Sequence, residues 1–375
     1  MQTSFDIVTV IMILGAVQGV FLSFLIYSQK KEYNLPGKFL SALILFISLL
    51  LFLAALYQSK NYSLILIFGP FLLPVFLTPG PLLYFYTRSL TDRKFQFSVK
   101  HLVHFIPYAI GVVVLSTLYF RSSGEQHEFI NNFYYDRARL FELAFRYADI
   151  LLRACYTFFA LKILYRYKEE LKNEFSSTEK FDYTWLKQLL IYCMISIFFL
   201  LIITVMNLGN NIRLIVGVYF SLLMYVIGYK FIKLKDIYSP AITEEKKVKY
   251  QKSGLSEKDK QEIGKQLENL MKKEKLHHES DISCGRLSLA LSVNQNHLSQ
   301  VINERFGKNF FEYINSYRIE EAKLLLISKE AKDWTILAIA FEVGFQSKST
   351  FNSVFKKITK MTPSQYREKY LKQVK

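Results

Sequence analysis

The chain has 375 residues, of which 51% are hydrophobic and 16% aromatic, and it carries a formal net charge of +17. An apolar membrane half joined to a basic half explains both properties, and the mean hydropathy of the whole chain is positive. The three cysteines imply no disulfide framework, because Cys155 and Cys193 lie in apolar segments and Cys284 lies in the basic half.

Seven apolar segments occupy residues 1–232. Each has about 18 to 23 residues, which is enough to cross a hydrocarbon core of about 30 Å. They run roughly from Ile7 to Tyr27, Phe39 to Tyr57, Leu64 to Tyr86, Leu102 to Phe120, Phe145 to Tyr165, Leu189 to Leu208 and Leu214 to Phe231. The sequence therefore predicts an N-terminal bundle of seven transmembrane helices.

The basic residues between these segments predict the orientation of the bundle. Three loops are rich in them: Lys30, Lys31 and Lys38, then Arg88, Arg93, Lys94 and Lys100, then Arg166, Lys168, Lys172 and Lys180. The loops at Lys60 and Arg213 are poorer, and residues 121–142 mix basic with acidic side chains. We expect a multi-pass protein of the bacterial inner membrane, with the N terminus outside and the C terminus cytoplasmic. The first segment lacks a basic n-region, so we expect it to be retained as a span.

The fifth segment carries alternating charges at helical spacing, from Glu142 and Arg146 to Asp149 and Arg153. Spacings of four, three and four residues place these side chains on one helix face, which must point into the bundle. One interpretation is a pocket for a polar or charged ligand, open to the outer side. The other is an internal ladder of ion pairs that satisfies itself.

The third segment is interrupted by Pro70, Pro74, Pro79, Gly80 and Pro81. Prolines remove helix hydrogen bonds, so a straight helix is not expected there. A broken helix that lines a cavity and a static kink are the two interpretations.

The first segment contains a GxxxG pattern at Gly15 and Gly19, which permits close helix approach. Packing within the bundle and dimerisation are both compatible with it.

Residues 233–255 are polar and basic, with Lys246, Lys247, Lys249 and Lys252. We interpret them as a linker that spans about 26 Å root mean square as a flexible coil. Its lysines lie in solvent, on anionic lipid or on DNA phosphate. An amphipathic helix is expected to begin at Ser256, and one of its faces carries Ile263, Leu267, Leu270 and Met271. This helix packs on the first helix-turn-helix pattern or pairs with a second copy of the chain.

Two helix-turn-helix patterns occupy the last domain, residues 256–375. In the first, from Leu287 to Asn303, Asn294 is placed to cap a second helix from about Gln295 to Arg305. In the second, from Ile336 to Lys357, Gly344 is placed to end one helix and Ser347 to cap the next.

The segment between the two patterns predicts a long connecting helix. Asn309 and Glu312 form a capping box, and the helix runs to about Ile327. Its length of roughly 28 Å is close to one turn of B-DNA, about 34 Å. Two recognition helices could therefore enter successive major grooves. A last helix begins with Thr362 as N-cap, Pro363 at the first position and Gln365 at the third.

At these residues the chain closely resembles the AraC/XylS family of transcription regulators, over about Ile282 to Lys372. The matching positions are Leu298, Ser299, Phe306, Gly307, Tyr313, Ile314, Arg318, Ala322, Ile339, Ala340, Gly344, Phe345, Ser347, Ser349, Phe351, Phe355, Lys356, Thr362, Pro363, Tyr366 and Arg367. Two departures stand in the first unit, where Ser288 and Ser292 replace the usual Ala and Gly. Ser288 is tolerated if its hydroxyl bonds back to a helix carbonyl, whereas Ser292 in a turn costs some stability.

Side-chain chemistry sorts the candidate DNA contacts. Base edges suit Gln295, Asn296, His297, Gln300 and Asn303 on the first recognition helix, and Gln346, Lys348, Thr350 and Asn352 on the second. Phosphates suit Lys308, Lys348, Lys356 and Lys357. The alternative for each is a solvated helix residue. For Arg318, with Glu321 near, we predict a structural ion pair.

The expected fold is all-α, and the expected function is a membrane-embedded, DNA-binding transcription regulator that senses a signal through its bundle, a one-component signalling protein. The alternative is a transporter or membrane enzyme with a fused regulatory domain. Expected partners are double-stranded DNA, the lipid bilayer, RNA polymerase and an unknown small ligand or membrane signal, and a homodimer stays open. No catalytic pattern is found, and His277, His278 and Glu279 lack the spacing of a metal-binding HExxH motif. We therefore expect no enzyme activity, cofactor or metal.

Overall fold

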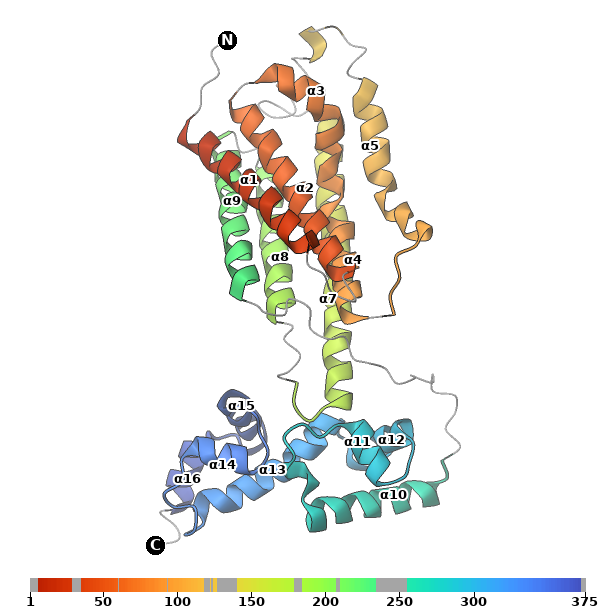
Figure 1. Cartoon of the computed structure of the whole chain (residues 1–375), viewed down its shortest axis with the longest axis vertical. Coiled ribbons are helices and arrows are strands. Elements are labelled where there is room, and N and C mark those ends of the chain that lie inside the picture. Colours follow the sequence, from red (N-terminus) through yellow and green to blue (C-terminus); the bar gives the residue numbers. More distant parts are fainter. Residues whose placement is uncertain are drawn as a thin grey trace. The chain divides into compact units, whose positions relative to one another are not determined.

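A computed structural model describes residues 6–28, 35–59, 61–92, 94–117, 122, 124–126, 140–178, 184–206, 210–233 and 255–371 (Figure 1). Over these residues the chain is helical, as predicted, and the bridge between Phe175 and Ser283 is isolated. The chain divides into two compact units, which we describe separately. The apolar unit comprises Met1–Tyr165 and Tyr183–Thr243, and the basic unit comprises Arg166–Asp182 and Glu244–Lys375. Most of the predicted linker lies outside the described residues.

The helices of the apolar unit follow the predicted apolar segments. They are α1 (Ile7–Ser28), α2 (Leu35–Gln58), α3 (Tyr62–Leu72), the 3-10 helix η1 (Leu73–Leu77), α4 (Pro79–Thr91), η2 (Val99–Phe105), α5 (Ile106–Ser116), α7 (Leu140–Glu174), α8 (Thr184–Val205) and α9 (Asn210–Lys233). Within the described residues, four helices are long and apolar enough to cross a membrane, at 7–28, 35–58, 99–116 and 184–205. A bent pair, at 63–77 and 79–91, makes a fifth if it counts as one span.

The predicted break in the third segment is confirmed. The two halves of the bent pair differ in direction by 48°. Pro74 lies in the first turn of η1 and Pro79 begins α4, positions at which a missing N–H costs no helix hydrogen bond. Gly80 faces α7, and a Cβ atom there would lie 2.9 Å from the ring of Tyr156. The break is therefore packed closely against a neighbouring helix.

Both glycines of the GxxxG pattern are used for packing inside the apolar unit. A Cβ atom on Gly15 would overlap the backbone and side chain of Ser221 on α9. One on Gly19 would overlap Ser48 on α2. Because only glycine lets α1 approach both neighbours this closely, the structure accounts for the pattern within one chain.

The basic unit contains α10 (Glu257–Asn269), the π-turn η4 (Leu270–Glu274), η5 (Leu276–His278), α11 (Cys284–Ala290), α12 (Gln295–Phe306), α13 (Phe310–Ile327), α14 (Ile336–Glu342), α15 (Lys348–Thr359) and α16 (Pro363–Leu371). The predicted caps are confirmed for Asn294, Asn309 and Ser347, whose side chains accept hydrogen bonds from backbone N–H groups. Thr362 and Gln365 form the predicted cap of α16.

One helix, α13, belongs to both hydrophobic cores of the basic unit. Its first half places Tyr313 and Ile314 in a core with α10, α11 and α12. Its second half places Ile319 and Ala322 in a core with α14 and α15. Figure 1 shows α13 running from one group of helices to the other. The amphipathic helix α10 packs on the first core through Ile263, Leu267 and Met271, one of the two predicted arrangements.

Candidate nucleic-acid interface

The first recognition helix, α12, is held by a buried face and presents polar residues on the other. Leu298, Val301 and Ile302 are fully buried. The candidate base readers Gln295, Asn296, His297 and Gln300 are half-buried, and Asn303 is exposed. Gln300 Nε2 donates to Glu304 Oε1 over 2.8 Å, and Asn303 Nδ2 donates to the Ser299 carbonyl over 2.8 Å. The Gln300 and Asn303 amides must break these hydrogen bonds within the helix before they can bind DNA.

The two departures from the family pattern lie in α11 and in the turn that follows it. Ser288 Oγ donates to the Gly285 carbonyl over 2.8 Å, so its hydroxyl bonds back to its own helix as predicted. Ser292 adopts a φ of 53°, in the left-handed region. This conformation is unfavourable for a residue with a Cβ atom, and the turn therefore stores strain.

The second recognition helix, α15, presents exposed lysines. Lys348 and Lys356 are exposed, and Thr350 and Asn352 are half-buried. The Oδ1 atom of Asn352 is buried and has no hydrogen-bond partner among the described residues. Asn352 therefore turns its acceptor into the unit, away from any base edge.

Two predicted phosphate contacts are engaged inside the basic unit. Lys357 Nζ lies 2.7 Å from Glu312 Oε1, in the capping box of α13. This hydrogen bond lowers the pKa of Glu312. Lys308 Nζ donates to Ser316 Oγ over 3.0 Å. Lys348 and Lys356 on α15 are therefore the better candidates for phosphate binding.

Gln346 lies where the two helix-turn-helix units meet. Its Nε2 donates to the Ser280 carbonyl over 3.1 Å, and its Oε1 accepts from Ser177 Oγ over 3.4 Å. Ser177 belongs to the segment that follows α7. A residue predicted to read bases is thus held by two contacts within the basic unit.

Arg318 is structural as predicted, but its partners are not carboxylates. The side chain is 1% exposed. Its Nε donates to the His277 carbonyl and one Nη2 bond reaches the Glu279 carbonyl, both over 2.7 Å. Further bonds reach Asn315 Oδ1 at 3.1 Å and Ser176 Oγ at 3.2 Å. Burial lowers the pKa of Arg318 to about 10, so the group stays charged at neutral pH. The predicted pair with Glu321 is therefore wrong.

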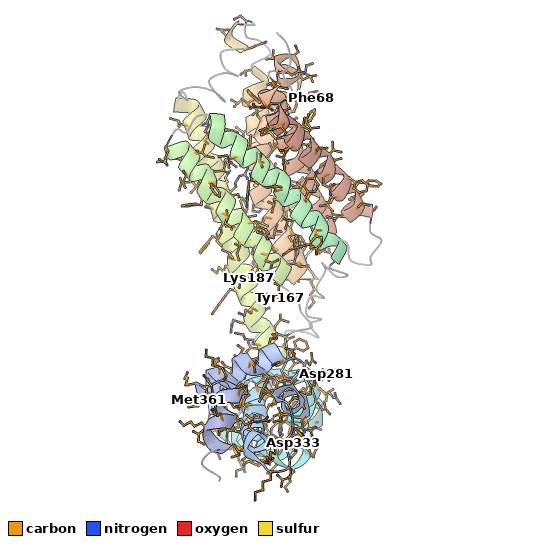
Figure 2. The ribbon with its side chains drawn as sticks, turned by 90° about the vertical axis from the view of Figure 1, so that its left-hand side faces the viewer. Phe68, Tyr167, Lys187, Asp281, Asp333 and Met361 are labelled. Atoms are coloured by element: carbon orange, nitrogen blue, oxygen red, sulfur yellow. The ribbon has the colours of Figure 1, made fainter. Side chains whose placement is uncertain are left out.

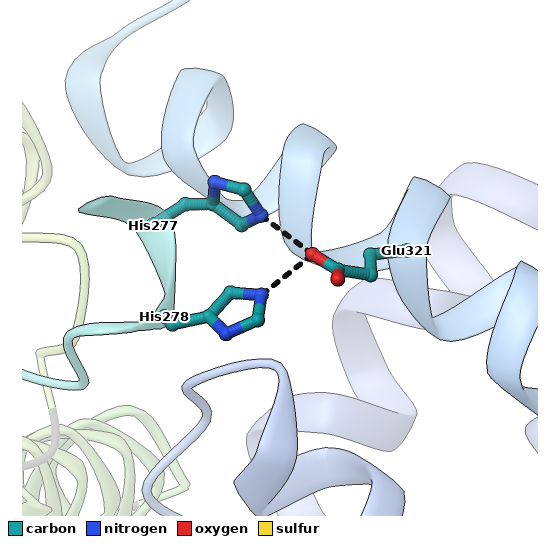
Figure 3. A group of neighbouring side chains, drawn as sticks. All are labelled: His277, His278 and Glu321. Carbon is teal, nitrogen blue, oxygen red and sulfur yellow. Dashed lines mark hydrogen bonds and ion pairs between the residues drawn. The ribbon is translucent and has the colours of Figure 1, made fainter. Parts of the chain in front are cut away.

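Glu321 instead meets three donors from the segment before α11, of which Figure 3 shows His277 and His278. Its Oε2 lies 2.8 Å from His277 Nε2 and 2.6 Å from His278 Nε2. Lys275 Nζ lies 2.6 Å from Oε1. Burial alone would raise the pKa of Glu321, but these hydrogen bonds outweigh it and hold the pKa at about 2. The two imidazoles and the carboxylate offer ligand atoms within 4.8 Å of one another.

Residues 287–369 match the protein family described as "Helix-turn-helix domain". The C-terminal part of the chain is an AraC-type helix-turn-helix domain. It is 40% identical over 92 residues to an uncharacterized HTH-type transcriptional regulator of Staphylococcus aureus (strain COL). It is also 32% identical over 95 residues to the uncharacterized HTH-type transcriptional regulator YtdP of Bacillus subtilis (strain 168). These matches cover 24% and 25% of this chain and 12% of each relative.

Among solved structures, the AraC-type domain is similar to the C-terminal domain of the two-component response regulator yesN from Fusobacterium nucleatum, at 32% identity and a TM-score of 0.25. The match covers 28% of this chain and 98% of that one. The C-terminal domain of AraT, a response regulator from Geobacillus stearothermophilus, matches at 28% identity and a TM-score of 0.26, over 28% of this chain and 84% of that one.

The candidate signal residues lie apart from the AraC-type domain sequence, on the first half of α7. Arg153 Nε lies 2.7 Å from Asp149 Oδ1, and its Nη2 donates to the Phe76 carbonyl over 2.9 Å. Pro79 follows Phe76 by three residues and lacks the N–H that a 3-10 turn would offer this carbonyl. Arg146 also has a partner, and the Glu142 side chain lies outside the described residues. The Asp149–Arg153 contacts favour the ladder interpretation.

Proposed function

We propose that this chain is a membrane-embedded, sequence-specific DNA-binding transcription regulator that senses a signal through its apolar unit. The observation that carries the proposal is an AraC-type domain in the same chain as helices apolar enough to cross a membrane, four to five of them within the described residues. The predicted seven spans, with the N terminus outside, place the AraC-type domain in the cytoplasm, where DNA is available.

The contacts of the segment after α7 support this orientation. Ser176 Oγ and N donate to the Ile282 carbonyl, over 2.9 and 3.2 Å, inside the basic unit. The C-terminal end of α7 must therefore lie on the same side of the membrane as the AraC-type domain. The distribution of basic residues among the loops independently predicts the same arrangement.

DNA binding is tested with the full chain in lipid nanodiscs. Footprinting on duplexes selected by the chain from a random pool should show protection over about two helical turns, with a steep loss at higher salt. Lys348→Ala and Lys356→Ala should weaken binding to all sequences, whereas Lys329→Ala, on the exposed turn after α13, should not. A wild-type chain without preference for any duplex over random DNA contradicts the proposal.

The topology is tested by cysteine labelling in a background that lacks the native cysteines. Gln126→Cys should react with a membrane-impermeant maleimide from outside, and Arg166→Cys only after permeabilisation. Arg166 is exposed and Gln126 is half-buried. The reverse pattern contradicts the orientation and the sensing role built on it.

A further inference from the structure

We infer that the surface where the two helix-turn-helix units meet is a docking site for Phe175–Ser177, and that DNA bound by the second unit competes with this docking. We call this surface the seam, and define it by Ile282, Asn315, Arg318 and Gln346. The inference rests on the proposed function and adds a route by which the apolar unit acts on the AraC-type domain.

Ser176 is bonded to the seam by every polar atom it has. Its N–H and hydroxyl donate to the Ile282 carbonyl, its carbonyl accepts from Asn315 Nδ2 over 3.1 Å, and its hydroxyl oxygen accepts from Arg318. The residue is 1% exposed. In a chance surface contact, some of these groups would bond to water. The hydrogen-bonding groups of the seam therefore match those of Ser176.

Arg318 explains why the docking is specific. A buried guanidinium without a carboxylate partner depends on neutral acceptors for its stability. Three of its acceptors come from His277, Glu279 and Asn315, and Ser176 Oγ, from the segment after α7, is the fourth. Without the segment, the Arg318 guanidinium loses the Ser176 acceptor, and this N–H group must bond to water instead.

Docking and base reading both require Gln346. While Ser177 Oγ donates to its Oε1, the amide of Gln346 is turned to the seam and Ser280. Phe175 forms an antiparallel bridge with Ser283, the residue that caps α11 in the first unit. The segment therefore contacts both helix-turn-helix units.

The segment is connected to the apolar unit by α7. This helix runs without interruption from Leu140 to Glu174, and its last turns, with Tyr167 labelled in Figure 2, belong to the basic unit. A rotation or shift of α7 can thus alter the docking directly, independently of the linker at 233–255.

The first test measures DNA affinity of the full chain in nanodiscs, with a fluorescent duplex selected by the wild type. Ser176→Leu removes the hydroxyl and adds bulk, and it should raise the affinity by about 3- to 10-fold, the effect of losing one or two docking hydrogen bonds. Asn173→Ala, an exposed change on the last turn of α7, should leave affinity unchanged. A fall in affinity, or no change, for Ser176→Leu contradicts the competition. A misfolded domain cannot produce the expected gain.

The second test locks the segment in place. Antiparallel bridge partners lie about 4.5–5.5 Å apart at Cα, within the range for a disulfide. Phe175→Cys with Ser283→Cys, in a chain whose native cysteines are replaced by Ala, should crosslink on oxidation. The crosslinked chain should bind DNA at least about 3-fold more weakly than the same chain after reduction. Crosslinking without an effect on affinity overturns the inference. Failure of the wild type to prefer any duplex overturns the proposed function instead, and crosslinking still reports docking.

A separate observation carries a second inference: the geometry points to His277, His278 and Glu321 as a site for a divalent transition metal, with Zn²⁺ the best match. Two imidazole nitrogens and a carboxylate oxygen are ligands that Zn²⁺ prefers over the oxygen-only sets of Mg²⁺ or Ca²⁺. Three protein ligands leave one position for water. His278 and Glu321 are half-buried, so an ion can reach the site.

The two histidine–carboxylate distances require a small expansion, and all the ligand atoms lie within 4.8 Å of one another. Metal bonds of about 2.0–2.1 Å in a tetrahedral site separate the ligand atoms by about 3.3 Å. The present separations are 2.6 and 2.8 Å between each Nε2 and Oε2. His277 Nδ1 is buried and accepts or donates no hydrogen bond within the described part of the chain. The ligand therefore lacks the support that usually strengthens such sites by about 10- to 100-fold. We therefore expect micromolar affinity. The ion would clamp η5 to α13.

Zinc binding is tested by calorimetry on the full chain in detergent, with Co²⁺ absorption as the spectroscopic probe. The wild type should bind one equivalent of Zn²⁺. His278→Ala and Glu321→Gln should lose it, while His297→Ala, on α12, should keep it. No Zn²⁺ binding by the wild type, or undiminished binding by either cluster variant, overturns this inference. Because the readout is the metal itself, the result does not depend on DNA binding.

Discussion

Arg318 donates a hydrogen bond to Ser176 over 3.2 Å, although 142 residues separate them. Arg318 lies on α13, the helix that belongs to both hydrophobic cores of the basic unit, and Ser176 lies in the segment that follows α7. The acceptor, Ser176 Oγ, is a neutral hydroxyl, so the guanidinium is held by directed hydrogen bonds and not by an opposite charge. The guanidinium therefore requires all its acceptors to be in place at once.

Arg318→Met should destabilise the basic unit by about 3–5 kcal/mol, because it leaves several buried carbonyl and side-chain acceptors unsatisfied. Arg318→Lys should recover little, since one ammonium cannot reach acceptors arranged around a planar fork. Hydrogen exchange of α13 in the full chain measures the loss. Leu324→Ala, at an exposed position of the same helix, is the control and should have little effect. Equal protection in the Met variant and the control contradicts the structural role.

Two glycines with positive φ should differ sharply in their tolerance of alanine. At Gly344, with a φ of 93°, a Cβ atom would lie 2.6 and 2.7 Å from the His278 and His277 carbonyl oxygens. At Gly307, with a φ of 62°, nothing lies within 4 Å. Gly307→Ala should cost about 1 kcal/mol from backbone strain alone, and Gly344→Ala clearly more. Thermal unfolding of both variants checks the order, and equal costs would show that backbone overlap at Gly344 is relieved.

Ser292→Gly should stabilise the first helix-turn-helix unit by about 0.5–1 kcal/mol. Its φ of 53° costs a serine more than a glycine, and the greater freedom of glycine in the unfolded chain offsets part of the gain. Ser353→Gly, exposed within α15, is the matched change without strain relief and should destabilise by about 0.5 kcal/mol. The comparison is made by chemical unfolding. Destabilisation by Ser292→Gly would mean that the serine has a role beyond its backbone.

The Glu312–Lys357 pair predicts a pH dependence. The pKa of Glu312 is lowered in the folded chain, chiefly by the hydrogen bond from Lys357. Its stabilising effect is therefore present above the unfolded pKa and disappears as the pH falls through the lower, folded value. Glu312→Gln should narrow the difference in α13 protection between pH 6 and pH 3. Both chains are compared at each pH by hydrogen exchange, and an identical acid loss would show that other carboxylates dominate.

Asp149→Ala should destabilise the apolar unit by about 3–5 kcal/mol, because it leaves Arg153 without its carboxylate in a buried site. Replacing both residues by leucine removes the unpaired charge and should restore much of the stability. Melting of the detergent-solubilised chain, followed by size-exclusion chromatography, measures both. If Asp149→Ala melts at the same temperature as the wild type, the Asp149–Arg153 pair does not stabilise the contact of α7 with the Phe76 carbonyl.

Features set by neighbouring residues could be predicted from the sequence, whereas those set by long-range packing could not. Asn294, Asn309 and Ser347 bond to amides two or three residues away, so spacing alone identified them as caps. Helical periodicity places Glu321 near Arg318 on the same helix and so predicts a pair between them. The structure gives it carbonyls that lie 39 and 41 residues away. The His277–Glu321 contact spans 44 residues, so no motif search could reveal it.

The sharing of α13 between two cores has a consequence for the operator. Because both recognition helices pack on the single helix α13, the distance and the angle between the two DNA subsites that they contact are fixed. One extra base pair between the subsites would rotate one relative to the other by about 34°. A regulator of this construction should therefore tolerate substitutions in the DNA between its subsites, but not a single inserted or deleted base pair.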